Sequence, residues 1–405
     1  MKIDKIYQGN AIDVMKTLPD KSVNCIITSP PYWGLRSYKT DGVIWDGDPN
    51  CPHDFISDGH YNDNMRFRAG HNTQVGNNKN PEIYTIKKSG GPNPKEPHAR
   101  FESSSQFCSL CGAWKGELGS EPTFTLFIQH LVQVFTECKR ILRDDGCLFV
   151  NLGDTYASGT RDNGNGYDET RWEKSKEGQN CKGWHIQPNR QLKNYQAKCL
   201  CLIPERFAIA MVDGGWILRN KIIWYKRSAM PSSAKDRFTV DWEAVYFFTK
   251  KAHYYFEQQF EPCAESTFER IKYPRGNENS KASKKIYGIQ TMDYGDYSQG
   301  RNKRCVWDVT PKGFKGSHYA VFPEALVEPM IKAGCPEGGL VYDPFMGAGT
   351  TAVVAKKLNR HYLGSELNQS YIEMAEDRIK QPNKVKRIRQ MYDSQPELEL
   401  SLAGG

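Results

Sequence analysis

The chain has 405 residues, 38% of them hydrophobic, and its 55 Lys and Arg against 47 Asp and Glu give a net charge of +8. This length exceeds one typical domain, so we expect one core that carries insertions. No apolar run approaches the roughly 20 residues that cross a bilayer, and the N-terminus lacks the apolar stretch of a signal peptide, which excludes a membrane-spanning protein and predicts a cytoplasmic one.

The first 33 residues predict a helix at residues 11–18 and a buried parallel strand at residues 23–27, where the run VNCII is mostly apolar. The hexapeptide TSPPYW follows at residues 28–33. Its two prolines cannot continue a hydrogen-bonded ladder, so the strand must end in a stiff loop.

Residues 39–121 are rich in Gly, Asn, Pro, Asp and Ser and have little periodicity, which indicates an insertion without an apolar core of its own. Core elements then resume. Apolar residues recur at helical spacing from Phe127 to Leu142, and a strand follows at residues 147–150.

A second polar, Gly-rich stretch occupies residues 159–198. Pro204 begins a predicted helix that ends near Met211, before a pair of glycines. Residues 216–225 and 244–249 are apolar and β-rich, so we expect two strands in the edge region of the same sheet.

Basic and aromatic residues dominate the stretch from Arg227 to Arg304, where Lys and Arg are interleaved with Tyr and aliphatic residues are scarce. Such a segment is either a solvated loop or a surface that grips phosphates and stacks on bases. The net positive charge favours a polyanionic partner, although ordinary variation in surface charge produces the same balance.

The last core unit predicts a helix from Pro323, a strand at residues 340–342, the loop DPFMGAGTT at residues 343–351, a helix, and a strand at residues 362–366. Glycines in this loop let the backbone approach a ligand closely, and the next helix points its N-terminus at an anionic group. Glu366 ends the second strand, where it is placed to accept hydrogen bonds from ribose hydroxyls. A purely structural turn beside a surface Glu is the alternative.

Two motifs carry a resemblance to a known family. DPFMGAGT at residues 343–350 resembles the adenosylmethionine loop of amino-methylating DNA methyltransferases, and TSPPYW at residues 28–33 resembles their catalytic tetrapeptide with its flanks. The order, catalytic loop first, is similar to the permuted beta class. The resemblance implies an α/β, Rossmann-like fold that binds S-adenosylmethionine (SAM), with a mostly parallel seven-stranded sheet and one reversed strand. The composition of the polar and basic stretches adds inserted zinc-binding-like and target-recognition segments.

The resemblance also implies the domain organisation and the partners. Duplex DNA is the expected substrate, with a cognate restriction nuclease and a homodimer as further candidate partners. The predicted segments are 1–38 (catalytic half of the core), 39–121 (insertion), 122–227 (core, with the polar insertion 159–198), 228–305 (target recognition, with an edge strand at 242–250), 306–380 (SAM-binding half) and 381–405 (tail).

The chemistry explains the catalytic motif. An exocyclic amine is a poor nucleophile because its lone pair is delocalised into the ring, so acceptors must localise that pair. In the tetrapeptide Ser29, Pro30, Pro31 and Tyr32, the Ser29 hydroxyl and the Pro30 carbonyl would accept the two amine hydrogens while Tyr32 stacks on a flipped base. No covalent intermediate is needed.

A catalytic cysteine in a Pro-Cys pair is typical of enzymes that methylate a carbon of cytosine. Pro262-Cys263 is such a pair, but the residues around it do not resemble that family.

Ser before Pro-Pro-aromatic is associated with cytosine, so Ser29 favours N4-methylcytosine, with N6-methyladenine as the alternative. Two rival functions are methylation of RNA or of a protein glutamine, whose enzymes usually carry Asn at this position, and a DNA-binding module without turnover. The complete pair of motifs argues against the second rival.

The resemblance places the cofactor among residues from several segments. Asn10 stands where the family usually has an acidic residue that contacts the adenine, and an amide can still bond an adenine edge. The predicted cofactor residues are Asn10, Asp13, Thr28, His318, Phe322, Pro323, Asp343, Pro344, Phe345, Gly347, Gly349, Thr350 and Glu366.

Four soft ligands lie in the first insertion. Cys51 and His53 form one pair, and Cys108 and Cys111 form a second at the spacing of a zinc knuckle. A structural zinc would provide folding energy that a polar insertion lacks. The alternative is scattered thiols among the 12 cysteines, which a reducing compartment keeps free. His60 or His98 could substitute for a ligand.

Overall fold

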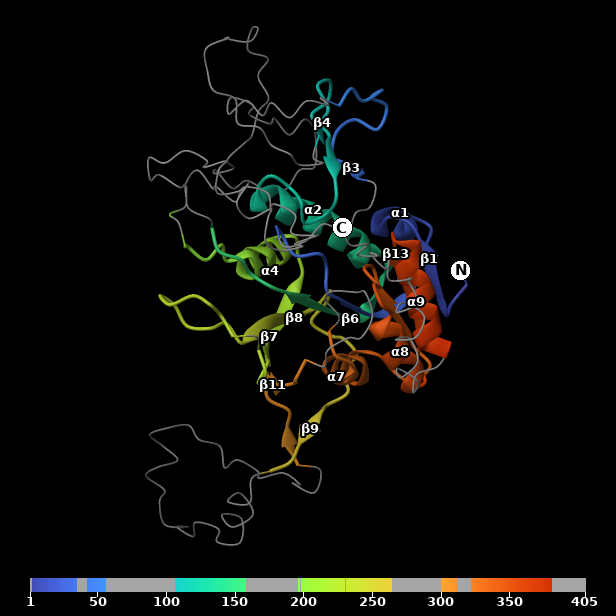
Figure 1. Cartoon of the computed structure of the whole chain (residues 1–405). Helices are drawn as coiled ribbons and strands as arrows, with labels where there is room; N and C mark the ends of the chain where they lie inside the picture. Colours follow the sequence, from blue (N-terminus) through green and yellow to red (C-terminus); the bar gives the residue numbers. More distant parts are fainter. Residues whose placement is uncertain are drawn as a thin grey trace, which may run out of the picture.

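The computed structural model describes residues 2–34, 42–55, 106–157, 196, 198–229, 231–263, 300–311 and 322–380. One eight-stranded sheet forms its centre (Figure 1). The strands in spatial order are β1 (Lys5–Gln8), β13 (His361–Glu366), β12 (Leu340–Asp343), β2 (Val23–Thr28), β6 (Leu142–Leu152), β8 (Trp242–Thr249), β7 (Ile217–Tyr225) and β11 (Val306–Asp308).

The direction of the strands confirms the predicted fold class. β8 is antiparallel to both of its neighbours, and every other adjacent pair in this sheet is parallel. The sheet has eight strands rather than the expected seven, because the short β11 adds to the edge beyond β7. The result is a Rossmann-like α/β sheet with one reversed strand.

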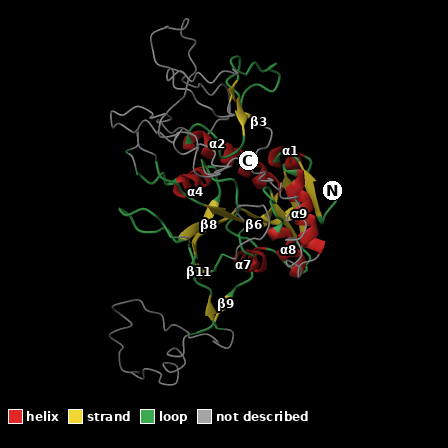
Figure 2. Cartoon of the chain, viewed as in Figure 1, coloured by secondary structure: helices red, strands yellow, loops and turns green. Residues whose placement is uncertain are grey.

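Helices cover both faces of the sheet (Figure 2). Residues of α1 (Ala11–Lys16), α2 (Phe124–Ile141) and α4 (Ile203–Asp213) share one apolar cluster, and residues of α7 (Glu324–Gly334), α8 (Thr350–Lys357) and α9 (Gln369–Lys380) share another. In β2, Ile26 belongs to the first cluster, whereas Cys25 and Ile27 belong to the second. Side chains of a strand point alternately to opposite faces, so a strand covered on both sides reads as a continuous apolar run.

Local signals explain where the helices begin and end. The Thr123 side chain accepts a hydrogen bond from the Leu126 N–H at 3.2 Å and caps α2. Pro204 lies in the first turn of α4, and Gly214 caps its other end. Among the described residues, no helix is long and apolar enough to span a membrane.

A small antiparallel sheet lies next to α2 (Figure 1), with the order β3 (Val43–Trp45), β5 (Trp114–Gly116) and β4 (Gln106–Phe107). The rings of Trp45 and Trp114 stack against His130 of α2 at 4.6 and 5.4 Å, and both tryptophans belong to the main core cluster. The ends of the predicted insertion therefore contribute to the core. A separate two-stranded ribbon comprises β9 (Phe260–Glu261) and β10 (Arg301–Asn302).

Candidate functional site

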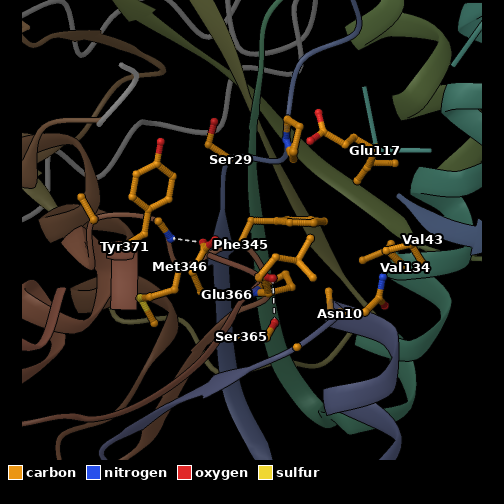
Figure 3. A pocket seen from close by; sticks show the side chains of 18 of the residues that line it. Asn10, Ser29, Val43, Glu117, Val134, Phe345, Met346, Ser365, Glu366 and Tyr371 are labelled. Carbon is orange, nitrogen blue, oxygen red and sulfur yellow. Dashed lines mark hydrogen bonds between the residues drawn. The ribbon is translucent and has the colours of Figure 1, made fainter. Parts of the chain in front are cut away.

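A pocket lies where the parallel strands β2, β12 and β13 end, at the edge where α/β sheets bind ligands (Figure 3). Nine of the residues predicted from the sequence line it: Asn10, Ser29, Pro31, Phe322, Pro344, Phe345, Gly347, Thr350 and Glu366. His318 falls outside the described residues, as do His60, His98 and residues 264–299 of the basic stretch.

The loop between β12 and α8 depends on its glycines. Gly347 has φ 51° and Gly349 has φ 78°, in the left-handed region that disfavours other residues. A Cβ on Gly349 would lie 2.7 Å from the Cβ of Ala375 in α9, so α9 packs directly on the loop. α8 begins at Thr350, which lines the pocket, so the N-terminus of this helix lies at the pocket wall.

Asp343 holds the loop from beneath. Its buried carboxylate accepts hydrogen bonds from the hydroxyls of Thr28 and Thr351, each at 2.7 Å, and from the N–H of Phe345 at 3.0 Å. Burial raises the pKa of Asp343 to about 6, against the opposing effect of these bonds. Thr28 and Asp343 thus lie behind the residues that line the pocket, and they join the end of β2 to the loop between β12 and α8, residues 344–349, here called the glycine loop.

Glu366 is the last residue of β13 and lines the pocket. One carboxylate oxygen accepts the N–H of Gly347 and the other accepts the N–H of Asn368, both at 2.9 Å. Burial raises the pKa of Glu366 above its usual value. Because a carboxylate oxygen accepts more than one hydrogen bond, Glu366 can bind ligand hydroxyls while it holds the loop.

Of the remaining predicted cofactor residues, some line the pocket and others lie outside its lining. Asn10 lines the pocket, and its side-chain oxygen caps α1 by accepting the Ile12 N–H at 2.8 Å. Asp13 is exposed and lies 3.8 Å from Lys16 on the same helix, away from the pocket lining. Phe322 lines the pocket, whereas Pro323 precedes α7 as its N-terminal cap residue.

The TSPPYW loop leaves β2 at Ser29, which lies on the pocket wall with Pro31 (Figure 3). The Ser29 hydroxyl is 3.4 Å from the Tyr32 hydroxyl. The Tyr32 ring packs against Gly153, where a Cβ would lie 2.5 Å from the ring. Pro30 is buried between Ser29 and Pro31.

Three residues of this region were not predicted from the sequence. The Tyr32 hydroxyl lies 3.1 Å from the side-chain oxygen of Asn151 and 3.0 Å from a carboxylate oxygen of Glu243. The Asn151 amide donates to Glu243 at 3.2 Å, and Lys226 forms an ion pair with Glu243. The sequence offered one signal for Asn151, because it is a polar residue near the carboxyl end of the apolar strand β6. The sequence offered no such signal for Glu243 and Lys226, because their positions near Tyr32 depend on which strands are neighbours.

A second feature missed by the sequence is the far wall of the pocket. Val43 and Trp45 of β3, Glu117 and Leu118 after β5, and Val134 of α2 all line it. Figure 3 shows Val43 and Val134 on the same side as Asn10, with Met346 and Tyr371 across from them. The small sheet of the insertion is therefore part of the site.

The four predicted metal ligands come together. The donor atoms of Cys51, His53, Cys108 and Cys111 all lie within 4.8 Å of one another. The Cys51 and Cys108 sulfurs are 3.8 Å apart, and the Cys111 sulfur is 3.4 Å from Nδ1 of His53. Three thiols and one imidazole at these separations are a suitable donor set for a tetrahedral metal ion.

Comparison with known proteins identifies the family. A family model described as DNA methylase, for N6 and N4 methylation, matches residues 23–377. The Type II methyltransferase M.Cfr9I of Citrobacter freundii is 30% identical over 375 residues, covering 92% of this chain and 87% of its own length. The Type II methyltransferase M.SmaI of Serratia marcescens is 28% identical and covers 93% of this chain and 90% of its own length.

Among solved structures, a PvuII DNA methyltransferase described as cytosine-N4-specific aligns with a TM-score of 0.49 and 14% identity, covering 97% of this chain and 92% of its own chain. The family model and the relatives span nearly the whole core, including both loops of the pocket. The chain therefore belongs to the N6/N4 DNA methylase family and is a Type II DNA methyltransferase.

Proposed function

We propose that this enzyme transfers a methyl group to the exocyclic amine of cytosine in duplex DNA and forms N4-methylcytosine. The observation that carries the proposal is Ser29, whose side chain lines the pocket at the end of β2, beside the glycine loop. N6-methyladenine is the alternative product, because a serine hydroxyl can accept a hydrogen bond from either amine.

The pocket fits SAM as the methyl donor. Glu366 offers carboxylate oxygens to ribose hydroxyls, Asn10 offers an amide to an adenine edge, and the N-terminus of α8 favours a carboxylate. The resemblance assigns His318, Phe322 and Pro323 to the methionine end of the cofactor, and of these Phe322 lines the pocket. When bound, SAM supplies an electrophilic sulfonium methyl group.

The catalytic loop prepares the target amine. The Ser29 hydroxyl and the Pro30 carbonyl would accept the amine hydrogens and localise the nitrogen lone pair, so that the nitrogen can attack the methyl carbon directly. The carbon–nitrogen bond would form as the carbon–sulfur bond breaks, with S-adenosylhomocysteine as the leaving group and one amine proton lost. Tyr32 offers its ring for stacking on a base turned out of the duplex. Its hydroxyl is bonded to Asn151 and Glu243, which restricts rotation of the ring before the base arrives.

We further infer a structural zinc ion held by Cys51, His53, Cys108 and Cys111. Thiolate and imidazole donors in this number favour zinc, and a site without an acidic ligand or open position suits a structural rather than a catalytic metal. A target-recognition region at residues 228–305, a cognate restriction nuclease, a homodimer and a cytoplasmic location stay predictions.

The decisive experiment identifies the methylated nucleoside. Purified enzyme is incubated with labelled SAM and duplex DNA of mixed sequence, and the DNA is digested to nucleosides. Labelled N4-methylcytosine is expected, and it should be lost in Ser29→Ala and Tyr32→Ala variants that still bind S-adenosylhomocysteine. N6-methyladenine would overturn the target base, whereas label only in RNA or protein would overturn the substrate. Cofactor binding without any transfer would favour the DNA-binding module.

A further inference from the structure

The four metal ligands come from two segments that are far apart in the sequence. Cys51 and Cys108 are 57 positions apart. Near the cluster, two hydrogen bonds join the segments. The Ser109 N–H donates to the Asp54 carbonyl at 2.8 Å, and the Ser109 hydroxyl donates to the Asp54 carboxylate at 2.9 Å. An isolated antiparallel β-bridge also pairs Phe55 with Cys108. Closing so long a loop costs conformational entropy, and a bound metal offsets that cost with its own binding free energy.

Both segments also contribute to the pocket wall. Val43 and Trp45 come shortly before Cys51, and Glu117 and Leu118 come shortly after Cys111. β3 pairs with β5 from Val43 opposite Gly116 to Trp45 opposite Trp114, and the Trp45 indole N–H donates to the Gly116 carbonyl at 3.2 Å. The segments that would hold the metal are therefore the same segments that line the pocket.

The metal cluster packs directly on the turn that follows β3. Gly47 has φ 82°, and a Cβ there would lie 2.9 Å from the Cys111 sulfur and 2.6 Å from the Cβ of Ala113. Asp46, in the same turn, bonds to His130 at 3.2 Å. A shift of Cys111 would therefore move this turn, and with it Trp45.

The wall is also bonded to the catalytic loop. The Trp33 indole donates to the Glu121 carbonyl at 2.8 Å, and the Gly34 N–H donates to the Gly119 carbonyl at 2.7 Å. The Glu121 carboxylate accepts the Gly119 N–H and bonds to the buried His130. Displacement of the wall would be transmitted to residues 33 and 34, directly after the TSPPYW tyrosine.

We propose that metal bound at Cys51, His53, Cys108 and Cys111 completes the cofactor pocket, so that metal binding and cofactor binding strengthen each other. This inference rests on the proposed function, because it takes the pocket to be the SAM site. The metal acts from outside the pocket, through β3, β5 and the turn at Gly47. By linkage, the two ligands must increase each other's affinity by the same factor.

The first test uses the whole wild-type chain and S-adenosylhomocysteine as the probe. Protein purified without chelator is expected to hold one zinc per chain by elemental analysis. Removal of zinc with a chelator should weaken S-adenosylhomocysteine binding, measured by calorimetry, by about tenfold or more. Added zinc should restore it. In the reverse direction, S-adenosylhomocysteine should raise zinc affinity against a chromophoric chelator by the same factor.

A matched pair of variants separates the cluster from other thiols. Cys108→Ser with Cys111→Ser should lose both zinc and S-adenosylhomocysteine affinity, whereas Cys199→Ser with Cys263→Ser, outside the cluster, should lose neither. Circular dichroism reports whether the first variant is folded. If it is not, the chelator titration of the wild-type chain decides.

The outcomes distinguish the two proposals. Equal S-adenosylhomocysteine affinity with and without zinc, or protein that contains no metal, would overturn the inference and leave the proposed function intact. Zinc-containing protein that binds no S-adenosylhomocysteine would overturn the cofactor site, and the inference with it. Zinc-dependent binding combined with methylation of a base other than cytosine would support the inference and contradict only the proposed target.

Discussion

The Tyr32 hydroxyl lies between two side chains of other strands, Asn151 of β6 and Glu243 of β8. Glu243 in turn pairs with Lys226, and the side chains of both are about one-fifth exposed. Neither Glu243 nor Lys226 lines the pocket, so we assign Glu243 as a positioning residue that acts through Tyr32. Its charge makes it a stronger acceptor than an amide would be.

We predict that Glu243→Gln lowers kcat by roughly tenfold, because a hydrogen bond to a charged group contributes about 1.5–3 kcal/mol and the amide keeps part of it. S-adenosylhomocysteine affinity should stay unchanged, since Glu243 does not line the pocket. Glu328→Gln, which breaks an exposed pair with Lys332 on α7, is the matched control. Steady-state kinetics with duplex DNA would contradict the role if both variants retained the wild-type kcat.

Asp343 predicts a pH dependence of stability. Its pKa in the folded protein is raised by burial to about 6, from a usual value of 3.8. The folded state therefore binds this proton more tightly than the unfolded state, and stability falls as pH rises from about 4 to about 6. This shift of about two units in the pKa of Asp343 corresponds to a loss of roughly 3 kcal/mol in the free energy of unfolding above pH 6.

Asp343→Asn removes this titration. The variant is spared the loss of stability that ionisation of Asp343 causes. Its free energy of unfolding, relative to that of the wild type, should therefore increase by up to roughly 3 kcal/mol between pH 4 and pH 6, on top of a constant offset from altered bonds to Thr28 and Thr351. Urea unfolding of both proteins at several pH values measures the difference. Two parallel curves would show that Asp343 does not titrate in this range.

At the scale of elements, the glycine loop and α9 form one unit. Gly349 has φ 78°, and a Cβ there would lie 2.7 Å from the Ala375 Cβ. Gly338 has a similar φ of 72°, but nothing lies within 4 Å of its Cβ position. The two glycines thus share a left-handed backbone conformation, which would strain any other residue, and they differ in packing.

Gly338→Ala should cost about 1–2 kcal/mol of stability through its left-handed backbone alone and leave S-adenosylhomocysteine binding intact. Gly349→Ala should cost about 1–3 kcal/mol more through overpacking against α9, and it should weaken S-adenosylhomocysteine binding because the loop must shift. Thermal unfolding and calorimetry measure both effects. Equal behaviour of the two variants would mean that α9 yields to the added methyl group.

At the scale of the whole molecule, the net charge of +8 predicts that DNA binding depends on salt. Changing Lys281, Lys284 and Lys285 together to Gln should reduce the slope of log Kd against log salt by about 0.9 for each DNA phosphate that the variant no longer neutralises. A control variant changes Lys16, Lys332 and Lys380, each near an acid on its own helix. Fluorescence anisotropy with a duplex at several salt concentrations compares them, and equal slopes would exclude the basic stretch from the DNA interface.

Much of the core could be predicted from the sequence because its signals are local. The apolar runs of β2 and β12 predict buried strands, and the prolines after Thr28 and the glycines after Phe345 determine the loops that follow. The four metal ligands could be proposed from residue type and spacing. Their meeting within 4.8 Å required two distant segments to pair in space.

Only the tertiary structure decided how these local pieces combine. The strand order brings Glu243 beside Tyr32, makes the small sheet a wall of the pocket, and leaves Thr28 and Asp343 beneath the loop that the sequence motif had placed around the cofactor. It also adds β11 at the edge of the sheet. Periodicity and turn conformation are determined by residues that are close in the sequence. Contacts between distant residues depend on which strands pair and on the face of the sheet to which each side chain points.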